Sequence, residues 1–355
     1  MAKTLYIMRM KHTVFVLAFM IIVSTACLFA AGTSENPEDL YRVGVFVPGV
    51  VDGSPTYEMM VRGVRRASSE AGGGVDVAVV EGGFDQSTWQ EGVMSMAVSG
   101  AYDLIVTSNP SMPEIVEAVT EAVPEVRFIV LDGYLSGNPR IHTVLFNQRE
   151  QAFLAGYFAG LVTQSALPRA NPDQRAGLLA GQEYPIMNDT ILPGFRLGFR
   201  TILPEGEVDF RVLGNWFDAG KAQEIATDMI GRGSDVILTI AGGGNQGVIA
   251  AARERGAYVL WYDDSGYDQA PGLVIGSSFV RQDDAAYEAT RAAIDGTLAF
   301  GEARILGVAD GAVSFDTEDP SFIRAVPEPI REEMEAILER LRSGNLLLEM
   351  NVPAR

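Results

Sequence analysis

The stretch Asp235–Gly266 reads DVILTIAGGGNQGVIAAARERGAYVLWYDDSG, and it decides the fold class of this chain. Its first part, Val236–Ala241, is a near-continuous apolar run, which is typical of a parallel strand buried on both faces. A glycine-rich turn, Gly242–Gly247, and a short helical stretch follow, and a second apolar run ends on Asp263. This order predicts one βαβ unit. In open α/β sheets, ligands bind outside the carboxyl ends of the strands, where Asp263 lies.

A similar pattern lies upstream, and three pairs of landmarks relate the two halves of the chain. Their offsets are nearly constant: Gly44 and Gly177 are 133 residues apart, Asp103 and Asp235 are 132 apart, and Asp132 and Asp263 are 131 apart. Strands alternate with helices in both halves, which is typical of a parallel, doubly wound sheet. We therefore expect an α/β fold with two doubly wound parallel-sheet lobes and a ligand cleft between them. Each lobe ends its fourth strand on an aspartate.

The joins between the lobes are expected at three places. The helix Asn147–Thr163 begins the second lobe, and the strand Leu273–Phe279 with the helix Asp284–Ile294 returns to the first. The helix Glu328–Ser343 carries an apolar stripe and packs on the second lobe. The predicted boundaries are residues 41–146 plus about 264–297 for lobe 1, and 147–263 plus about 298–355 for lobe 2.

The N-terminus has the pattern of a secretory signal in residues 1–27, followed by a linker in residues 28–40. Arg9 and Lys11 precede the apolar run Val14–Val23, which is shorter than the about 20 residues of a membrane span. Cys27, the one cysteine of the chain, follows small residues at the end of this run. This position resembles a bacterial lipobox, so we expect lipidation at Cys27 and a lipid anchor on the extracytoplasmic side of the cell membrane. Ordinary cleavage nearby is the alternative.

Charge and composition exclude several classes of function. The formal net charge of −19 argues against a nucleic-acid partner, because phosphate binding needs a basic face. Beyond the signal, the sequence has no cysteine and a single histidine, His142, within the strand-like stretch Ile141–Val144. Cysteine nucleophiles, histidine triads, and metal sites built from thiolates or several histidines are therefore not expected. We predict no catalysis, no metal and no cofactor.

The glycine-rich turn leaves two interpretations open. Gly242, Gly244 and Gly247 match the dinucleotide-binding fingerprint, with Asp263 about 20 residues further on. The corresponding segment of the first half, Ser108–Ser111, has no glycine, and a secretory signal places the protein outside the cytosolic NAD pool. The second interpretation is that glycines let the backbone approach a small ligand between the lobes.

Taken together, these residues resemble the basic membrane protein family of bacterial solute-binding lipoproteins, also called the purine nucleoside receptor family. The resemblance covers about residues 41–350. It is most specific in Glu150–Leu161, in Gly194–Gly198 and in the stretch that ends at Asp263. It implies the type I periplasmic binding protein fold and a role in feeding an ABC permease.

The resemblance also implies ligand-binding residues. The family's ribose-binding aspartate corresponds to Asp263, its first-lobe strand-end aspartate to Asp132, and its Ala-Gly-Gly loop to Gly242 or Gly243. The family's lysine after the next strand falls on or beside Arg281. In the segment where the family reads and stacks on the base, this chain has Asp52 and Tyr57, and Tyr184 stands near the second stacking position. The Phe-Asn pair of the family is missing.

From these observations we expect an extracytoplasmic solute-binding lipoprotein of an ABC importer. The expected ligand is a purine nucleoside or a similar ribose-bearing solute, bound as the two lobes close. One alternative is a binding protein for a free sugar or another small polar solute. An alternative of another class is a secreted nucleotide-dependent α/β enzyme that uses the Gly242–Gly247 loop. A LacI-type regulator of the same fold would need a basic helix-turn-helix where the signal sequence stands.

Overall fold

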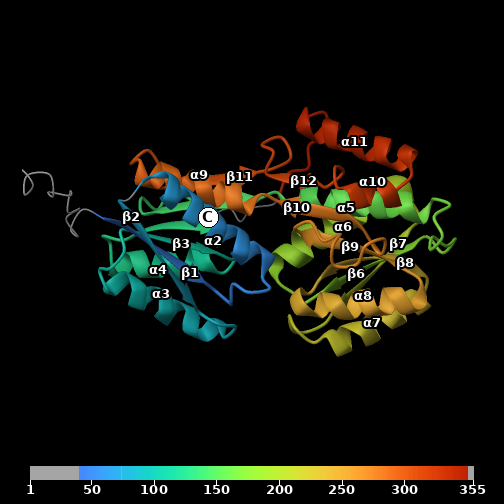
Figure 1. Cartoon of the computed structure of the whole chain (residues 1–355), viewed down its shortest axis with the longest axis horizontal. Helices are drawn as coiled ribbons and strands as arrows, with labels where there is room; N and C mark the ends of the chain where they lie inside the picture. The colour runs from blue at the N-terminus through green and yellow to red at the C-terminus, as the bar shows by residue number, and fades with distance from the viewer. Residues whose placement is uncertain (1–39, 73, 351–355) are drawn as a thin grey trace, which may run out of the picture. The chain divides into compact units, whose positions relative to one another are not determined.

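Two six-stranded sheets, each flanked by helices, form the frame of this computed structural model, which describes residues 40–72 and 74–350 (Figure 1). The predicted signal, linker and Cys27 lie outside the described residues, apart from Leu40. The described chain from Tyr41 onward is one compact unit. Within this part of the chain, no helix is long and apolar enough to cross a membrane.

The first sheet has the order β11-β5-β4-β3-β1-β2, and all its neighbouring strands are parallel. Its strands are β1 (Tyr41–Val47), β2 (Val75–Glu81), β3 (Leu104–Ser108), β4 (Arg127–Leu131), β5 (Ile141–Phe146) and β11 (Ala303–Leu306). The helices of this lobe are α2 (Pro55–Glu70), η2 (Gln86–Thr88), α3 (Trp89–Val98), α4 (Met112–Ala122) and α9 (Gln282–Ile294). The strand β3 is buried along its whole length, as expected for a strand covered on both faces.

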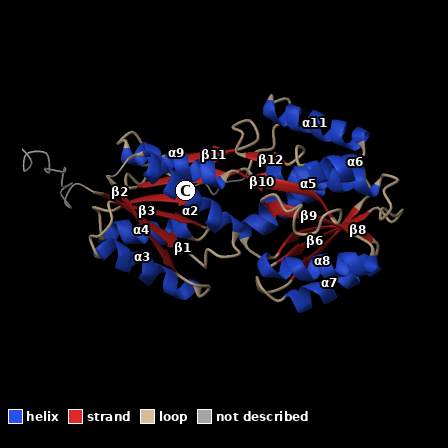
Figure 2. Ribbon diagram, in the orientation of Figure 1, coloured by secondary structure: helices blue, strands red, loops and turns tan. Residues whose placement is uncertain are grey.

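The second sheet has the order β12-β10-β9-β8-β6-β7, and β12 is its one antiparallel strand. Its strands are β6 (Arg175–Ala180), β7 (Glu207–Val212), β8 (Ser234–Ile240), β9 (Tyr258–Asp263), β10 (Val274–Val280) and β12 (Val313–Phe315). The helical elements of this lobe are α5 (Gln148–Thr163), η3 (Met187–Ile191), α6 (Leu192–Ile202), α7 (Ala219–Gly231), η4 (Gly242–Gly244), α8 (Asn245–Arg255), α10 (Pro320–Ala325) and α11 (Glu328–Arg342). Figure 2 shows helices on both faces of each sheet.

The two sheets are copies of one design, which confirms the predicted fold class. The strand that appears first in each lobe pairs with the second and the third, and the order then continues outward to the fourth and fifth. Asp132 directly follows β4, and Asp263 is the last residue of β9. The internal repeat therefore places both aspartates at the carboxyl ends of equivalent strands.

The structure corrects the predicted boundaries at two strands. We expected the chain to return to the first lobe at about residue 264, but β10 pairs in parallel with β9 and extends the second sheet. The crossing comes only at Arg281, after which α9 packs on α2 because Gly63 leaves room for the Asp283 carbonyl and Ala286 (Figure 1). Conversely, β11 was assigned to the second lobe but pairs with β5 of the first.

Glycines set the close contact between α5 and α6. A Cβ atom on Gly156 would lie 2.0 Å from the Phe195 carbonyl oxygen, and one on Gly198 would lie 2.1 Å from the Phe153 carbonyl oxygen. Both obstacles are backbone atoms, so no side-chain rotation can relieve the clash. The amino end of α5 thereby sits firmly on the second lobe, and this end carries residues of the candidate site.

Substitution of Gly156 with alanine is therefore expected to destabilise the protein by about 2 kcal/mol, the middle of the range for overpacking a core. The matched control is Gly231→Ala, because no atom lies within 4 Å of a Cβ built there at the end of α7. Thermal unfolding of the two variants checks the difference. Equal melting temperatures would show that the two helices can move apart without cost.

Candidate functional site

Asp132 and Asp263 adopt a backbone conformation that side-chain-bearing residues seldom adopt. Their φ angles are +51° and +74°, and among the described non-glycine residues only Gln174 shares the positive sign. Aspartate tolerates this region better than most residues, but the conformation still costs energy and persists where the surroundings enforce it. Both turns come at the carboxyl end of a strand, where binding residues gather in α/β sheets.

One turn of α5 binds both carboxylates. The Gln148 side chain donates a hydrogen bond from Nε2 to Oδ1 of Asp132, at 2.6 Å. Gln151, one turn later, donates from Nε2 to Oδ1 of Asp263 at 3.1 Å and to the Ser278 carbonyl oxygen at 3.3 Å. Residues three apart on a helix lie on the same face, so these two amides form one platform. The platform connects the strand ends of the two sheets.

Burial and neighbouring negative charge raise the pKa of both carboxylates. Burial raises the pKa of Asp132 to about 7, the negative charge of Asp263 adds to the rise, and the Gln148 amide opposes it. Burial also raises the pKa of Asp263 to about 6. The hydrogen bond from Gln151 lowers this pKa, and the negative charge of Asp264 raises it. Because the ionised forms are incompletely solvated, donors from a ligand would stabilise them strongly.

The first lobe adds Tyr57 to this pair. The Tyr57 hydroxyl donates to the Pro48 carbonyl oxygen at 3.0 Å and accepts from Nδ2 of Asn109 at 3.3 Å. Burial, with a contribution from the charge of Asp132, raises its pKa to about 12. Tyr57 therefore lies within electrostatic reach of Asp132 as a neutral ring with a fixed hydroxyl.

The second lobe adds Tyr184 and Trp216. Burial and the charges of Asp263 and Asp132 raise the pKa of Tyr184 well above its ordinary value, so its hydroxyl lies near both carboxylates. The rings of Tyr184 and Trp216 are 6.3 Å apart and inclined by 47°. Trp216 also lies against Gly181 and places its carbonyl oxygen over Gly242. An aromatic wall thus borders the carboxylates from the second sheet.

The glycines of the turn after β8 serve mainly internal packing. Gly242 has φ of +57°, and a Cβ there would lie 2.7 Å from the Trp216 carbonyl oxygen. A Cβ on Gly247 would lie 1.9 Å from the Ala219 carbonyl oxygen, so this glycine lets α8 approach α7. Gly243 is exposed and borders Phe217. The fingerprint spacing at this turn is therefore explained without a dinucleotide.

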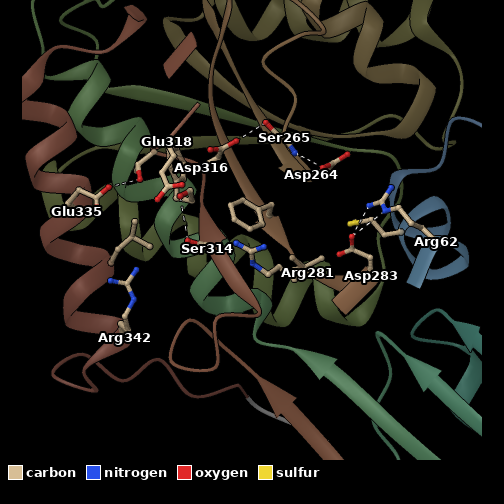
Figure 3. Close-up of a pocket in the computed structure, with 16 residues that line it drawn as sticks. Arg62, Asp264, Ser265, Arg281, Asp283, Ser314, Asp316, Glu318, Glu335 and Arg342 are labelled. Carbon is tan, nitrogen blue, oxygen red and sulfur yellow. Dashed lines mark hydrogen bonds and ion pairs between the residues drawn. The ribbon is translucent and has the colours of Figure 1, made fainter. Parts of the chain in front are cut away.

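Two predicted site residues lie apart from the cluster. Asp52 is exposed in the loop after β1, and its carboxylate makes no hydrogen bond to any described residue. Arg281 lies 3.9 Å from Asp284 and stacks 5.4 Å from the Phe279 ring centroid. It lines a cavity of about 450 Å³ that Asp264 also lines, while neither strand-end aspartate does (Figure 3). Their contact with a ligand stays a prediction.

The structure thus brings together Tyr57, Asp132, Tyr184 and Asp263, with Gly242 joined to them through Trp216. Sequence reasoning missed Trp216 and the two glutamines. The glutamines did leave a signal, because they are polar residues one turn apart in the polar first turn of a helix whose remainder is mostly small and apolar. No group of described residues gathers enough histidine, cysteine, aspartate or glutamate to hold a metal ion.

Gln282 is a further missed residue and ties the crossing segment to the first lobe. Its buried Nε2 donates to the Thr56 carbonyl oxygen at 2.8 Å and to Oγ of Ser108 at 3.1 Å. Thr56 precedes Tyr57 in the first turn of α2, so this amide fixes the start of the helix that carries the tyrosine. The residue after the crossing therefore supports the site from behind.

Removing the Gln151 amide is expected to raise the pKa of Asp263 by about one unit, because the amide stabilises the ionised form. The variant Gln151→Leu keeps the volume, and carbon-13 NMR titration of the carboxyl groups measures the shift. Gln164→Leu is the matched control, since Gln164 is exposed at the other end of α5. An unchanged Asp263 titration in Gln151→Leu would contradict the assigned hydrogen bond.

A family model described as ABC transporter substrate-binding protein PnrA-like matches residues 40–346 of the chain. The chain is 26% identical over 183 residues to the CD4+ T-cell-stimulating antigen of Listeria monocytogenes, a match that spans 50% of this chain and about half, 49%, of that relative. It is 25% identical over 152 residues to the ABC transporter nucleoside-binding protein BmpA of Lactococcus lactis subsp. cremoris, covering 43% and 41% of the two chains.

Among solved structures, a solute-binding protein of an ABC transporter system from Aeropyrum pernix K1 superimposes with a TM-score of 0.73. The sequences are 22% identical, and the match covers 86% of this chain and 92% of that one. At this identity the likeness concerns the fold. It agrees with the two lobes described above.

Proposed function

Because this chain belongs to the family of PnrA-like ABC transporter substrate-binding proteins, we propose that it captures a purine nucleoside or similar ribose-bearing solute for an ABC permease. Members of such a family bind a solute and hand it over, and they are not enzymes. The finer statements, namely the ligand, the lipid anchor and the extracytoplasmic location, are our proposal. A free sugar or another small polar solute is the second candidate.

The observation that carries the proposal is the pair of strand-end carboxylates, Asp132 and Asp263, held by one turn of α5. A carboxylate can accept two hydrogen bonds from neighbouring hydroxyl groups, and such charge-assisted bonds are about twice as strong as neutral ones. The vicinal hydroxyls of a ribose offer this pair of donors. Tyr57 and Tyr184 supply aromatic surface beside them, which suits a sugar face or a base ring.

The nucleoside is favoured over a free sugar by two further points. One relative carries the name nucleoside-binding protein. Trp216 also lies beside the Tyr184 ring and enlarges the aromatic surface, and a base offers a flat partner for it. The third expectation, a nucleotide-dependent enzyme, is set aside because the family consists of binding proteins and the turn glycines serve packing.

We propose that Cys27 carries the lipid that anchors the protein. The support is its place in the sequence, after small residues and a short apolar run. Detergent phase partition of the protein expressed in a bacterium tests this, with Cys27→Ser as the comparison. The wild type is expected in the detergent phase and Cys27→Ser in the aqueous phase. Equal partition of the two would overturn the anchor.

A thermal-shift screen tests the ligand proposal. The panel contains adenosine, guanosine, inosine, the pyrimidine nucleosides, the free bases and several sugars. At a ligand concentration of about 100 times the dissociation constant, a specific ligand stabilises the folded state by about 2.7 kcal/mol. We expect a purine nucleoside to give the largest shift. If every nucleoside fails while a free sugar shifts the transition, the second candidate replaces the first.

A further inference from the structure

Two exposed phenylalanines occupy equivalent places in the two lobes. Phe84 follows β2 and is 65% exposed, and Phe217 follows β7 and is 73% exposed. They stand 133 residues apart, the offset of the internal repeat. Single exposed apolar residues are common on protein surfaces. Two large rings, each directly before the aspartate that caps the next helix of its own lobe, indicate a shared purpose.

Both rings are presented by firmly held loops. The Gly83 amide donates to the Gly49 carbonyl oxygen at 2.9 Å, and the equivalent Gly214 amide donates to the Gly181 carbonyl oxygen at 2.8 Å. A backbone hydrogen bond thereby connects each loop to the segment that follows the first strand of its own lobe.

A second set of hydrogen bonds pins each loop. Trp89 donates from Nε1 to the Gly83 carbonyl oxygen at 2.8 Å, and the Phe217 amide donates to Oδ1 of Asn215 at 3.0 Å. Each phenylalanine also precedes an aspartate, Asp85 or Asp218, that caps the following helix by accepting a backbone hydrogen bond at 3.0 Å. These hydrogen bonds hold both loops in place, although each loop leaves a large apolar ring exposed to water.

The sheet order places both loops at the end of the sheet farthest from the crossings. The chain passes between the lobes after β5, after β10 and between β11 and β12, and these strands form one end of each sheet. The strands β2 and β7 form the opposite end. A rotation of one lobe about the crossing segments moves this far end most. Phe84 and Phe217 therefore border the part of the site that opens and closes.

Both phenylalanines also touch the loops of the candidate site. A Cβ on Gly49 would lie 2.9 Å from the Tyr57 ring and 3.8 Å from the Phe84 ring, so the two rings flank one glycine. A Cβ on Gly243 would lie 3.5 Å from the Cα atom of Phe217. Phe84 thus lies across one glycine from Tyr57, and the Phe217 backbone lies beside Gly243, so each phenylalanine is near a residue predicted to contact the ligand in its own lobe.

We propose that Phe84 and Phe217 meet when the lobes close on a ligand, and that this apolar contact holds the site shut and keeps water out. The partner of each ring is the other lobe. The proposal rests on the solute-binding function, and it adds the contact between the two lobes that forms when they are fully closed. Covering both rings removes apolar surface from water, and an aromatic pair gains further from its edge-to-face or offset geometry. Excluding water strengthens the hydrogen bonds to the carboxylates.

Cross-linking tests the meeting of the two loops and does not depend on a known ligand. In the background Cys27→Ser, which has no native cysteine, the pair Phe84→Cys and Phe217→Cys is treated with a short bismaleimide. The matched control moves one cysteine to Val98, which is equally exposed at the far end of α3. The first pair is expected to cross-link at least several times faster than the control, and faster again with inosine or the purine nucleoside that binds. Equal rates for the two pairs would overturn the proposal.

Affinity tests the energy of the contact. Phe84→Ala and Phe217→Ala are each expected to weaken binding of that nucleoside about tenfold, and the double variant by little more, because either change removes the same contact. The melting temperature of the ligand-free protein should not fall, and Val98→Ala should bind as the wild type does.

Fully additive losses, or none, would refute a shared contact. Losses of cellular uptake alone, with affinity and cross-linking unchanged, would assign the two rings to the permease instead. If no nucleoside binds, the proposed ligand fails, while the cross-linking comparison still decides the contact.

Discussion

Replacement of Asp263 with alanine is expected to weaken nucleoside binding on the order of 1,000-fold. Hydrogen bonds to a charged group contribute about 1.5–3 kcal/mol each, and the carboxylate is proposed to accept two from the ribose hydroxyls. A loss of about 4 kcal/mol corresponds to roughly 1,000-fold in the dissociation constant. Titration calorimetry of the variant with the nucleoside identified in the screen measures this loss.

The neighbouring residue provides the control. Asp264 is also acidic and directly follows β9, but it lines the cavity of Figure 3 and does not belong to the cluster around α5. Asp264→Ala should therefore bind within about threefold of the wild type, within the scatter expected for a change away from the contact. If Asp263→Ala binds as tightly as the wild type, the site assignment is wrong.

Affinity is expected to fall on the order of 100-fold between about pH 8 and about pH 5.5, because Asp263 must be ionised to accept the two ribose hydrogen bonds and Asp132 must be ionised to accept a further hydrogen bond from the ligand. The raised pKa values of Asp132, about 7, and Asp263, about 6, set this window. A site built from carboxylates with ordinary pKa values would bind with constant affinity over the same range. Calorimetry at several pH values distinguishes the two.

The stability of the ligand-free protein should change in the opposite direction. Both folded pKa values lie above the ordinary 3.8, so the folded state binds protons that the unfolded chain releases. The resulting stabilisation is complete below about pH 4 and is lost as the pH rises through 6 to 7. Asp132→Asn combined with Asp263→Asn should remove this part of the pH dependence. A wild-type melting temperature that rises from pH 5.5 to pH 8 by the same amount as in the double variant would contradict the shifts.

The fold was predictable because its internal repeat can be detected in the sequence. The offsets of 131 to 133 residues between the landmarks indicated two copies of one lobe, and the sheets have the same strand order. The assignment of β10 failed for a physical reason. A buried apolar strand such as Val274–Val280 can pair at the edge of either sheet. Its sequence pattern does not determine which neighbouring strand it pairs with.

The positions of the candidate site residues in the fold were predictable only where local sequence determines them. Asp132 and Asp263 stand directly at strand ends, so their position follows from the strands. Gln148 and Gln151 act through contacts with residues 16 and 112 positions away, which no local pattern reveals. The ligand contact of Arg281 stays a prediction, because its place one position after a buried strand does not determine on which side the long side chain emerges.

One calorimetric comparison shows whether the strand-end carboxylates recognise the vicinal hydroxyls of a ribose. The wild-type protein is titrated with inosine, or the purine nucleoside that the screen selects, and with its 2′,3′-dideoxy analogue, which keeps the base and lacks both hydroxyls. We expect the analogue to bind at least about 100-fold more weakly, because it loses roughly 3 kcal/mol of charge-assisted hydrogen bonds. Equal affinity for the two compounds would contradict it.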